Sequence, residues 1–209
     1  MYKLMLIPTI FNDYPECIPK KGILHVGAHS CEEKELYNSI GIVDKNILWI
    51  EADINLVKKY ITNNNIIHAV ISNKDNESVN FNITNNEGQS SSILNLKTHK
   101  YEHPNVYVVE VRNMKTITLN TLFQNYNIAY DTYDFINLDI QGAELFALQG
   151  ATQILPHIKA VYCEVNEKEL YENCGLITDL EQLLSEYGFT RKAIVMTQHG
   201  WGDALYVRT

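Results

Sequence analysis

A chain of 209 residues fits one domain, and its content of 45% apolar residues is that of a folded protein rather than a disordered one. The formal net charge of −8 at pH 7 disfavours nucleic acid as a partner, because non-specific binding depends on Lys and Arg side chains that neutralise phosphates. No stretch is long and apolar enough to span a membrane. We therefore expect a single domain over 1–209 that binds neither nucleic acid nor membrane.

The four cysteines, at positions 17, 31, 163 and 174, indicate no zinc site and no redox motif, because no two of them form a C-x-x-C pair. Residues 5–11 are too short, and too interrupted by Pro8, for the apolar core of a signal peptide. Free thiols without a secretory signal favour a reducing compartment, so we expect the protein in the cytoplasm.

The first third of the chain predicts alternating strands and helices. Residues 1–21 are expected to be an irregular lead-in, because Pro8, Pro15 and Pro19 exclude a long helix. The elements expected after it are strands at 23–28, 46–50 and 66–71 and helices at about 31–40 and 54–62. Such a β-α-β-α-β start predicts parallel strands joined by right-handed crossovers.

The middle of the chain departs from this alternation. Residues 79–83 alternate apolar and polar side chains, as a half-exposed strand does, and a polar loop at 85–104 leads to another strand at 106–111. A short helix is expected at about 118–126. We interpret 78–112 as a small inserted β and loop segment that forms a lid over the ligand pocket.

The alternation of strands and helices then resumes. The expected elements are strands at 134–138 and 159–165, helices at 143–155 and about 177–187, and strands at about 189–196 and 203–208. Gly150 falls inside one of these helices, which predicts close packing at that point. The last two strands are separated by a short link, so they form an antiparallel hairpin. The result is a mostly parallel α/β sheet with one antiparallel strand near its end.

Gly27 marks the expected ligand pocket. It follows an apolar strand and precedes a polar run that begins a helix. A glycine there permits a tight turn and leaves no side chain between the strand end and a ligand. In open α/β sheets, ligands bind outside the carboxyl ends of the strands. The dinucleotide fingerprint G-x-G-x-x-G is absent, because His29 and Glu32 occupy the positions of its later glycines, and this disfavours a nicotinamide dinucleotide.

Glu51 ends the second expected strand. An acid at this point accepts hydrogen bonds from both ribose hydroxyls of an adenosine ligand. The alternative is an acid that serves the N-terminus of the following helix. Ser72 and Asn73 end the third expected strand, where an adenine ring would lie.

Asp139, Glu164 and Asn166 form a second group of polar residues. Each lies at or beside the end of an apolar strand, and we expect these strands to be neighbours. Three oxygen ligands with open coordination positions suit Mg²⁺ or Mn²⁺. Alternatively, Asp139 orients a cofactor amine or a loop amide, and Glu164 caps nearby backbone.

Several further polar residues are candidates with two interpretations each. His25 and His29 lie near the end of the first strand, where a lone histidine is more often structural than a base; His29 is the better placed to face the pocket. Glu144 either caps a helix that it begins or forms a salt bridge in the site. His199 and Trp201 lie in a glycine-flanked turn that either reaches the acceptor or is simply exposed.

The run from Asn137 to Glu144, followed by Leu148-Gln149-Gly150-Ala151, resembles the D-x-x-G-x-E…L-x-G-A signature of FkbM-type methyltransferases. Other landmarks of the family are matched in order by Val26-Gly27-Ala28, Ile50-Glu51-Ala52, Ser91-Ser92-Ile93, Glu164-Val165-Asn166 and 202–207. The resemblance covers about 22–208. The family usually reads D-x-G-A-N-x-G at the first motif, where His25, His29 and Cys31 replace the acid, the Asn and the second Gly.

The resemblance implies a Rossmann-like class I methyltransferase fold with a mostly parallel seven-stranded sheet and S-adenosylmethionine as methyl donor. We expect donor contacts from His25, Gly27, Ala28, His29, Glu51, Ala52, Ser72, Asn73 and Asp139. The expected catalytic residues are Asp139, His29 and Glu144, beside a metal site at Asp139, Glu164 and Asn166.

The resemblance further implies O-methylation of a small-molecule or glycosidic hydroxyl, and we expect a saccharide. The alternatives are O-methylation of another small molecule or a peptide, and a non-catalytic nucleotide-binding module with the same fold. A nucleotide-linked oxidoreductase is disfavoured by the missing glycines.

Overall fold

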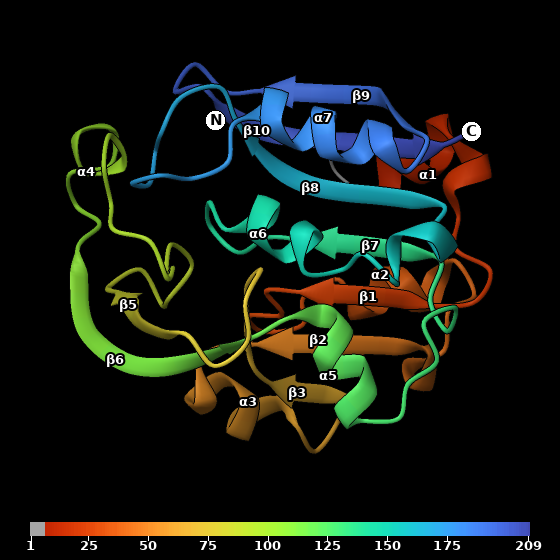
Figure 1. Ribbon diagram of the computed structural model, residues 1–209, viewed down its shortest axis with the longest axis horizontal. Helices are drawn as coiled ribbons and strands as arrows, with labels where there is room; N and C mark the ends of the chain where they lie inside the picture. The colour runs from red at the N-terminus through yellow and green to blue at the C-terminus, as the bar shows by residue number, and fades with distance from the viewer. Residues whose placement is uncertain (1–6) are drawn as a thin grey trace.

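Residues 7–209, which the computed structural model describes, contain a seven-stranded sheet with helices on both faces (Figure 1). In spatial order its strands are β3 (Ile66–His68), β2 (Ile47–Glu51), β1 (Ile23–Val26), β7 (Phe135–Leu138), β8 (Ala160–Asn166), β10 (Trp201–Arg208) and β9 (Phe189–Met196). The strands from β3 to β8 pair in parallel, whereas β10 is antiparallel to both of its neighbours. The predicted mostly parallel sheet with one antiparallel strand near its end is confirmed.

The order of the strands reverses at β1. The chain moves outward from β1 through β2 to β3, and then returns to place β7 on the other side of β1. A crevice for a ligand opens at such a reversal, outside the carboxyl ends of the strands. The pocket that the sequence predicts over Gly27 lies at this point.

Both faces of the sheet are buried, which explains why its strands are continuously apolar. Successive side chains point to opposite faces, so that Leu24 and Val26 join one core and Ile23 joins the other. The first core is closed by α5 (Leu119–Asn125), α6 (Glu144–Gln149) and α7 (Ile177–Glu186). The second is closed by α1 (Ile7–Asp13), α2 (Lys34–Ser39) and α3 (Ile54–Tyr60). Short 3-10 turns lie at η1 (Pro15–Cys17), η2 (Asp44–Asn46) and η3 (Leu155–His157).

Two predicted elements differ in the structure. Residues 7–13 of the expected irregular lead-in form α1, and Pro8 is accommodated in its first turn, where a backbone N–H has no intrahelical partner. The helix predicted at 143–155 ends at Gln149, with Gly150 as its cap. A β-carbon at Gly150 would lie 2.5 Å from the carbonyl oxygen of Ser72. Close packing at Gly150 is therefore confirmed, although at the end of the helix rather than inside it.

A second sheet lies beyond the carboxyl ends of the main strands (Figure 1). Its strands are, in order, β4 (Val70–Ile71), β6 (Val108–Ile117) and β5 (Ser78–Thr84). The third strand predicted at 66–71 is thus divided, because β3 pairs with β2 whereas β4 pairs with β6. The Ala69 N–H still donates to the Glu51 carbonyl at 3.0 Å, but the Ser72 N–H donates to the Ile117 carbonyl at 3.1 Å. The chain changes sheets between these two residues.

The inserted segment predicted at 78–112 forms an antiparallel ribbon of β5 and β6 that continues to Ile117. Between the two strands, the chain folds back so that Ser92 bridges to Asn82, and it then forms the short helix α4 (His99–Glu102). None of the helices in this part of the chain, or elsewhere in 7–209, has the length and apolar character that crossing a membrane requires.

Candidate functional site

Two cavities meet at the carboxyl end of β1. The first has a volume of about 240 Å³ and extends from Gly27 to Glu51 and β4; we call it the Glu51 cavity. The second has a volume of about 290 Å³ and extends from Gly27 to β8 and β10, where Glu164 lines it; we call it the Glu164 cavity. Both cavities are lined by the four junction residues Gly27, His29, Glu32 and Asp139.

The backbone at Gly27 admits no side chain. Its φ is +92°, and a β-carbon there would lie 1.8 Å from the carbonyl oxygen of Asp139. The N–H groups of Gly27 and Ala28 both donate to the Ile50 carbonyl, at 2.9 and 3.0 Å. The tight turn predicted at Gly27 is confirmed, and it brings the ends of β1, β2 and β7 together.

His29 connects this turn to the inserted segment. Its backbone, at a φ of +42°, donates its N–H to Oε2 of Glu51 at 2.8 Å. Its ring places Nε2 3.1 Å from the carbonyl oxygen of Glu87 and Nδ1 3.3 Å from Oε1 of Glu32. The side chain therefore lies beyond the strand end, at the junction of the two cavities and against the loop that follows β5.

Glu51 binds backbone N–H groups at the ends of β1 and β2 and also faces a cavity. It lines the Glu51 cavity and is 8% exposed. Its Oε2 accepts the His29 N–H, and its Oε1 accepts the Asp53 N–H at 2.7 Å. Burial raises the pKa of Glu51, while these two backbone hydrogen bonds favour its charged form. Each carboxylate oxygen keeps a second lone pair, so the residue can still accept hydrogen bonds from a ligand.

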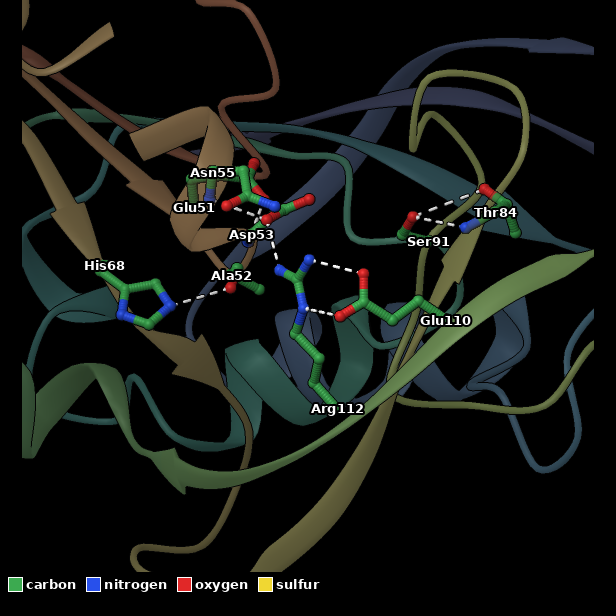
Figure 2. Close-up of polar contacts among 9 residues, drawn as sticks. All are labelled: Glu51, Ala52, Asp53, Asn55, His68, Thr84, Ser91, Glu110 and Arg112. Atoms are coloured by element: carbon green, nitrogen blue, oxygen red, sulfur yellow. Dashed lines mark hydrogen bonds and ion pairs between the residues drawn. The ribbon is translucent and has the colours of Figure 1, made fainter. Parts of the chain in front are cut away.

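Arg112 of β6 joins the inserted sheet to the start of α3 (Figure 2). Its Nη1 donates to Oδ1 of Asp53 at 2.6 Å, and its Nε and Nη2 donate to the two oxygens of Glu110 at 2.6 and 2.8 Å. Asp53 in turn accepts the Asn55 N–H at 2.9 Å and caps α3. The sequence offered no signal for this contact, because Arg112 and Asp53 are far apart in the chain.

The loop between β5 and α4 forms one wall of the Glu51 cavity, to which it contributes Gln89, Ser91 and Ser92. Ser91 is held by the Thr84 N–H, which donates to its Oγ at 3.1 Å (Figure 2). The Ser92 hydroxyl donates to the Gln141 carbonyl at 2.8 Å. These polar side chains of the loop thus lie on the Glu51 cavity.

The far end of the Glu51 cavity is apolar. Ala69, Val70 and Ile71 line it, opposite Phe81 of β5. Ser72 and Asn73, which the sequence placed at an adenine ring, line neither cavity: the Ser72 N–H bonds to Ile117, and the Asn73 amide donates to Oε1 of Gln149 at 2.8 Å. They are displaced because β4 leaves the main sheet before the third strand would have ended.

The remaining predicted donor contacts divide between the cavities. Ala52 lines the Glu51 cavity, where its carbonyl lies 2.9 Å from Nε2 of His68 (Figure 2). Ala28 and His25 line only the Glu164 cavity. His25 is 2% exposed; its Nδ1 lies 3.0 Å from the Tyr37 hydroxyl, and its ring lies 4.6 Å from that of Trp49. Burial lowers the pKa of His25 to about 4, so it is a neutral, structural histidine.

Asp139 and Glu164 are brought together, as the sequence predicts for the ends of neighbouring strands. Between them lies Gln141, whose Nε2 donates to Oδ1 of Asp139 at 2.6 Å and to Oε2 of Glu164 at 3.1 Å. The Tyr171 hydroxyl donates to Oε1 of Gln141 at 2.6 Å. Desolvation raises the pKa of Asp139 and, more strongly, that of Glu164. Gln141 has a φ of +56°, so the turn after β7 holds a strained residue between the exposed Asp139 and the buried Glu164.

The metal site predicted at Asp139, Glu164 and Asn166 does not fit this arrangement. An amide N–H group of Gln141 points at both carboxylates, where a cation would be expected. Asn166 is buried, and neither of its amide atoms has a hydrogen-bond partner. Within 7–209, no group of three or more His, Cys, Asp or Glu side chains could hold a metal ion.

Glu144 caps the turn that carries Asp139. Its Oε1 accepts the N–H groups of Ile140 at 2.8 Å and of Gly142 at 3.3 Å, and burial raises its pKa to about 8. It lines neither cavity, and its hydrogen bonds hold the turn that follows Asp139; its predicted catalytic role stays a prediction.

His199 and Trp201 lie away from both cavities. Nδ1 of His199 lies 2.6 Å from Oε2 of Glu102 in α4, and Trp201 packs against a small apolar cluster that contains Leu170 and Tyr171. Both side chains are half-buried, so the turn is not simply exposed, as one of the two interpretations held.

Comparison with known proteins identifies the family. The profile of the family described as "Methyltransferase FkbM domain" matches residues 23–191, which include the Gly27 turn, Glu51, Asp139 and Glu164. No curated protein matches the chain in a sequence comparison.

Three solved structures are similar to this chain at low sequence identity. A magnesium protoporphyrin IX methyltransferase from Synechocystis PCC 6803 with bound S-adenosylhomocysteine is 10% identical, with 95% of this chain and 78% of that chain covered and a TM-score of 0.48. Fibrillarin from Aeropyrum pernix with bound S-adenosylmethionine is 10% identical, with 91% and 68% covered and a TM-score of 0.46. An S-adenosylmethionine-dependent methyltransferase from Aquifex aeolicus is 11% identical, with 90% and 82% covered and a TM-score of 0.39.

The family match spans four fifths of the chain, and the motifs that carry it fold around the junction of the two cavities. This protein belongs to the FkbM methyltransferase family.

Proposed function

We propose that this methyltransferase transfers a methyl group from S-adenosylmethionine to a hydroxyl group of a saccharide. The observation that carries the proposal is the junction of two cavities at Gly27, His29, Glu32 and Asp139. One cavity suits an adenosine ligand and the other can admit an acceptor, so the two reactants would meet at one point.

The donor is assigned to the Glu51 cavity. The apolar wall of Ala69, Val70 and Ile71 suits an adenine ring, and Glu51 has lone pairs for the ribose hydroxyls. The turn at Gly27 leaves room for the methionine portion, because no β-carbon intervenes. His29 replaces the Asn of the usual family motif and would contact this portion of the donor.

When bound, S-adenosylmethionine supplies a methyl group that needs no further activation. The protein must hold the acceptor oxygen in line with that methyl group and accept the proton of the hydroxyl. The new bond forms between acceptor oxygen and methyl carbon, the bond from that carbon to sulfur breaks, and the neutral thioether product leaves.

Asp139 is the proposed proton acceptor. It lies at the junction, and its raised pKa makes the carboxylate a stronger base than an unperturbed aspartate. His29 also lies at the junction and is the second candidate. Gln141 would hold Asp139 in position through the bond to its Oδ1.

A saccharide is favoured by the carboxyl groups that line the Glu164 cavity, because they can accept hydrogen bonds from hydroxyls. The net charge of −8 supports a small or glycan acceptor rather than nucleic acid.

Free cysteines at all four positions support a reducing compartment such as the cytoplasm.

The test is to incubate the enzyme with methyl-labelled donor and a panel of glycans, polyketide alcohols, peptides and RNA. Label on a saccharide oxygen that is lost in Asp139→Asn is the expected result. Label only on RNA, or only on nitrogen, would overturn the proposal. Donor binding without transfer to any member of the panel would favour a non-catalytic module.

A further inference from the structure

The Glu164 cavity has an unusual charge. Five of its lining residues are acidic: Glu32, Glu33, Asp139, Glu164 and Asp203. Neither Lys nor Arg lines it among the described residues. Of its two histidines, His25 is kept neutral by burial, and His29 lies beside Glu32. A concave surface with this excess of acid favours a ligand of positive charge.

Glu164 is the acid that most needs such a ligand. It is 7% exposed; its Oε2 accepts the Gln141 amide, but its Oε1 has no hydrogen-bond partner. A buried carboxyl oxygen without a partner is costly, because it has lost water and gained nothing in return. An N–H group of a ligand in this cavity would satisfy it.

The sheet places a second acid directly beside Glu164. In the antiparallel register of β8 and β10, Asp203 is the partner of Glu164, so both side chains lie on the same face of the sheet. Acidic residues directly opposite each other repel, and Asp203 also shares a hydrogen bond with Tyr162. Asp203 comes from the one antiparallel strand, and it lines the same cavity.

We propose that the acceptor carries a protonated amine close to the hydroxyl that is methylated, so that it is an amino sugar. This inference rests on the proposed function, because it takes the Glu164 cavity as the acceptor site. Glu164 and Asp203 would receive the ammonium group, while Asp139 at the junction receives the hydroxyl proton. A divalent cation bound by the same acids is the competing explanation.

The experiment compares methyl glycosides of glucosamine and galactosamine with their N-acetylated counterparts, which carry a neutral acetamide in place of the charged amine. Binding is measured by calorimetry with S-adenosylhomocysteine present, and methyl transfer is measured as kcat/KM. We expect both to favour the free amine. Asp203→Asn should reduce affinity for the free amine by at least about tenfold while leaving the N-acetylated glycosides unaffected, as expected for loss of a charge-assisted hydrogen bond.

Glu186→Gln is the matched control, because Glu186 is an exposed acid at the end of α7 and should change neither preference. Calorimetry with MgCl₂ alone tests the competing explanation. Binding of Mg²⁺ that Asp203→Asn removes, without selectivity for the amine, would overturn the inference.

The inference and the proposed function fail in different ways. Amine-selective binding without transfer to any saccharide would retain the inference about the cavity and refute the proposed reaction. Transfer that is equally fast for amino and N-acetylated glycosides would retain the reaction and refute the inference. Absence of amine-selective binding to the wild-type enzyme would refute the inference whatever the enzyme methylates.

Discussion

At the scale of single residues, the site depends on a few positions where backbone and side chains approach very closely. Gly27 is the strictest of them. A β-carbon there would meet the Asp139 carbonyl at 1.8 Å, whereas Gly41, which has nearly the same φ of +93°, has nothing within 4 Å. The two glycines therefore separate the cost of a left-handed backbone from the cost of a steric clash.

We expect Gly27→Ala to lower the free energy of unfolding by about 3 kcal/mol or more, because it adds a clash to backbone strain. Gly41→Ala should lower it by only about 1 kcal/mol, since strain alone applies. Urea unfolding of both variants measures the difference. Equal losses would mean that β1 and β7 can separate at this point without cost.

The second prediction concerns Glu51. Glu51→Ala should weaken binding of S-adenosylmethionine at least about tenfold, because charge-assisted hydrogen bonds to the ribose are lost. It also removes the acceptor of the His29 and Asp53 N–H groups, so thermal unfolding of the free variant should be followed alongside calorimetry. An unchanged dissociation constant in a folded variant would exclude Glu51 from the donor site.

The third prediction follows from the raised pKa of Asp139. A base must be ionised to accept a proton, so kcat/KM should fall as the pH falls through the pKa of Asp139. Because desolvation raises that pKa, the fall should lie above the pH of about 4 at which an unperturbed aspartate titrates. Asp139→Asn should abolish transfer while donor binding persists. A profile that is flat down to pH 4 would assign the proton to another group.

At the scale of secondary structure elements, the inserted sheet is tied to the donor side of the site at several points. Arg112 bonds to Asp53, the His29 ring lies against Glu87, and Ser92 bonds to the Gln141 carbonyl. These contacts join β6 and the loop after β5 to the ends of β1, β2 and β7. The ribbon is thus held over the Glu51 cavity by polar contacts from two sides.

We expect Arg112→Ala to raise the KM for the donor severalfold with little change in kcat, because the loop that walls the Glu51 cavity loses one attachment. Global stability should change by less than about 1 kcal/mol, as is usual for ion pairs near the surface. Arg191→Ala removes a comparable pair with Glu181, far from the cavity, and serves as the control. Equal KM values for the two variants would contradict a role for Arg112 in donor binding.

The predicted elements show where sequence reasoning succeeds. Strands that are buried on both faces are continuously apolar. The apolar runs that end in Gly27, Glu51 and Asp139 therefore predicted the strands and the edge of the sheet at which they end. The division of the strand predicted at 66–71 into β3 and β4 was not predictable. Both parts are largely apolar, and β4 is separated from β3 only because it pairs with β6, which lies far along the chain.

The same limit applies to the site residues. Asp139 and Glu164 could be expected together, since they end neighbouring parallel strands. The sequence could not predict the roles of Gln141, Arg112 and Asp203, because each depends on parts of the chain that only folding brings together. Gln141 lies in a strained turn, Arg112 forms a salt bridge between the two sheets, and Asp203 belongs to a cross-strand pair. Ser72 and Asn73 were misplaced because the chain changes sheets just before them.

At the scale of the whole molecule, the two cavities lie on opposite sides of the β1 turn, and the inserted loop walls one of them. If the donor occupies the Glu51 cavity, S-adenosylhomocysteine should slow hydrogen exchange at 27–31 and 85–93 and leave α7 unchanged. Mass spectrometry of exchanged peptides measures this. Slower exchange confined to segments around β8 and β10 would place the donor in the Glu164 cavity instead.

The reversed direction of β10 has a consequence for how such an enzyme can change over evolution. Because β10 runs against its neighbours, its first residues, Trp201 to Asp203, reach the edge at which β8 ends. Residues at that end of the hairpin can therefore vary without disturbing the strands that would hold the donor. An engineer who wished to alter acceptor preference could graft the 197–203 segment from a relative, and expect the methyl-donating half of the molecule to remain intact.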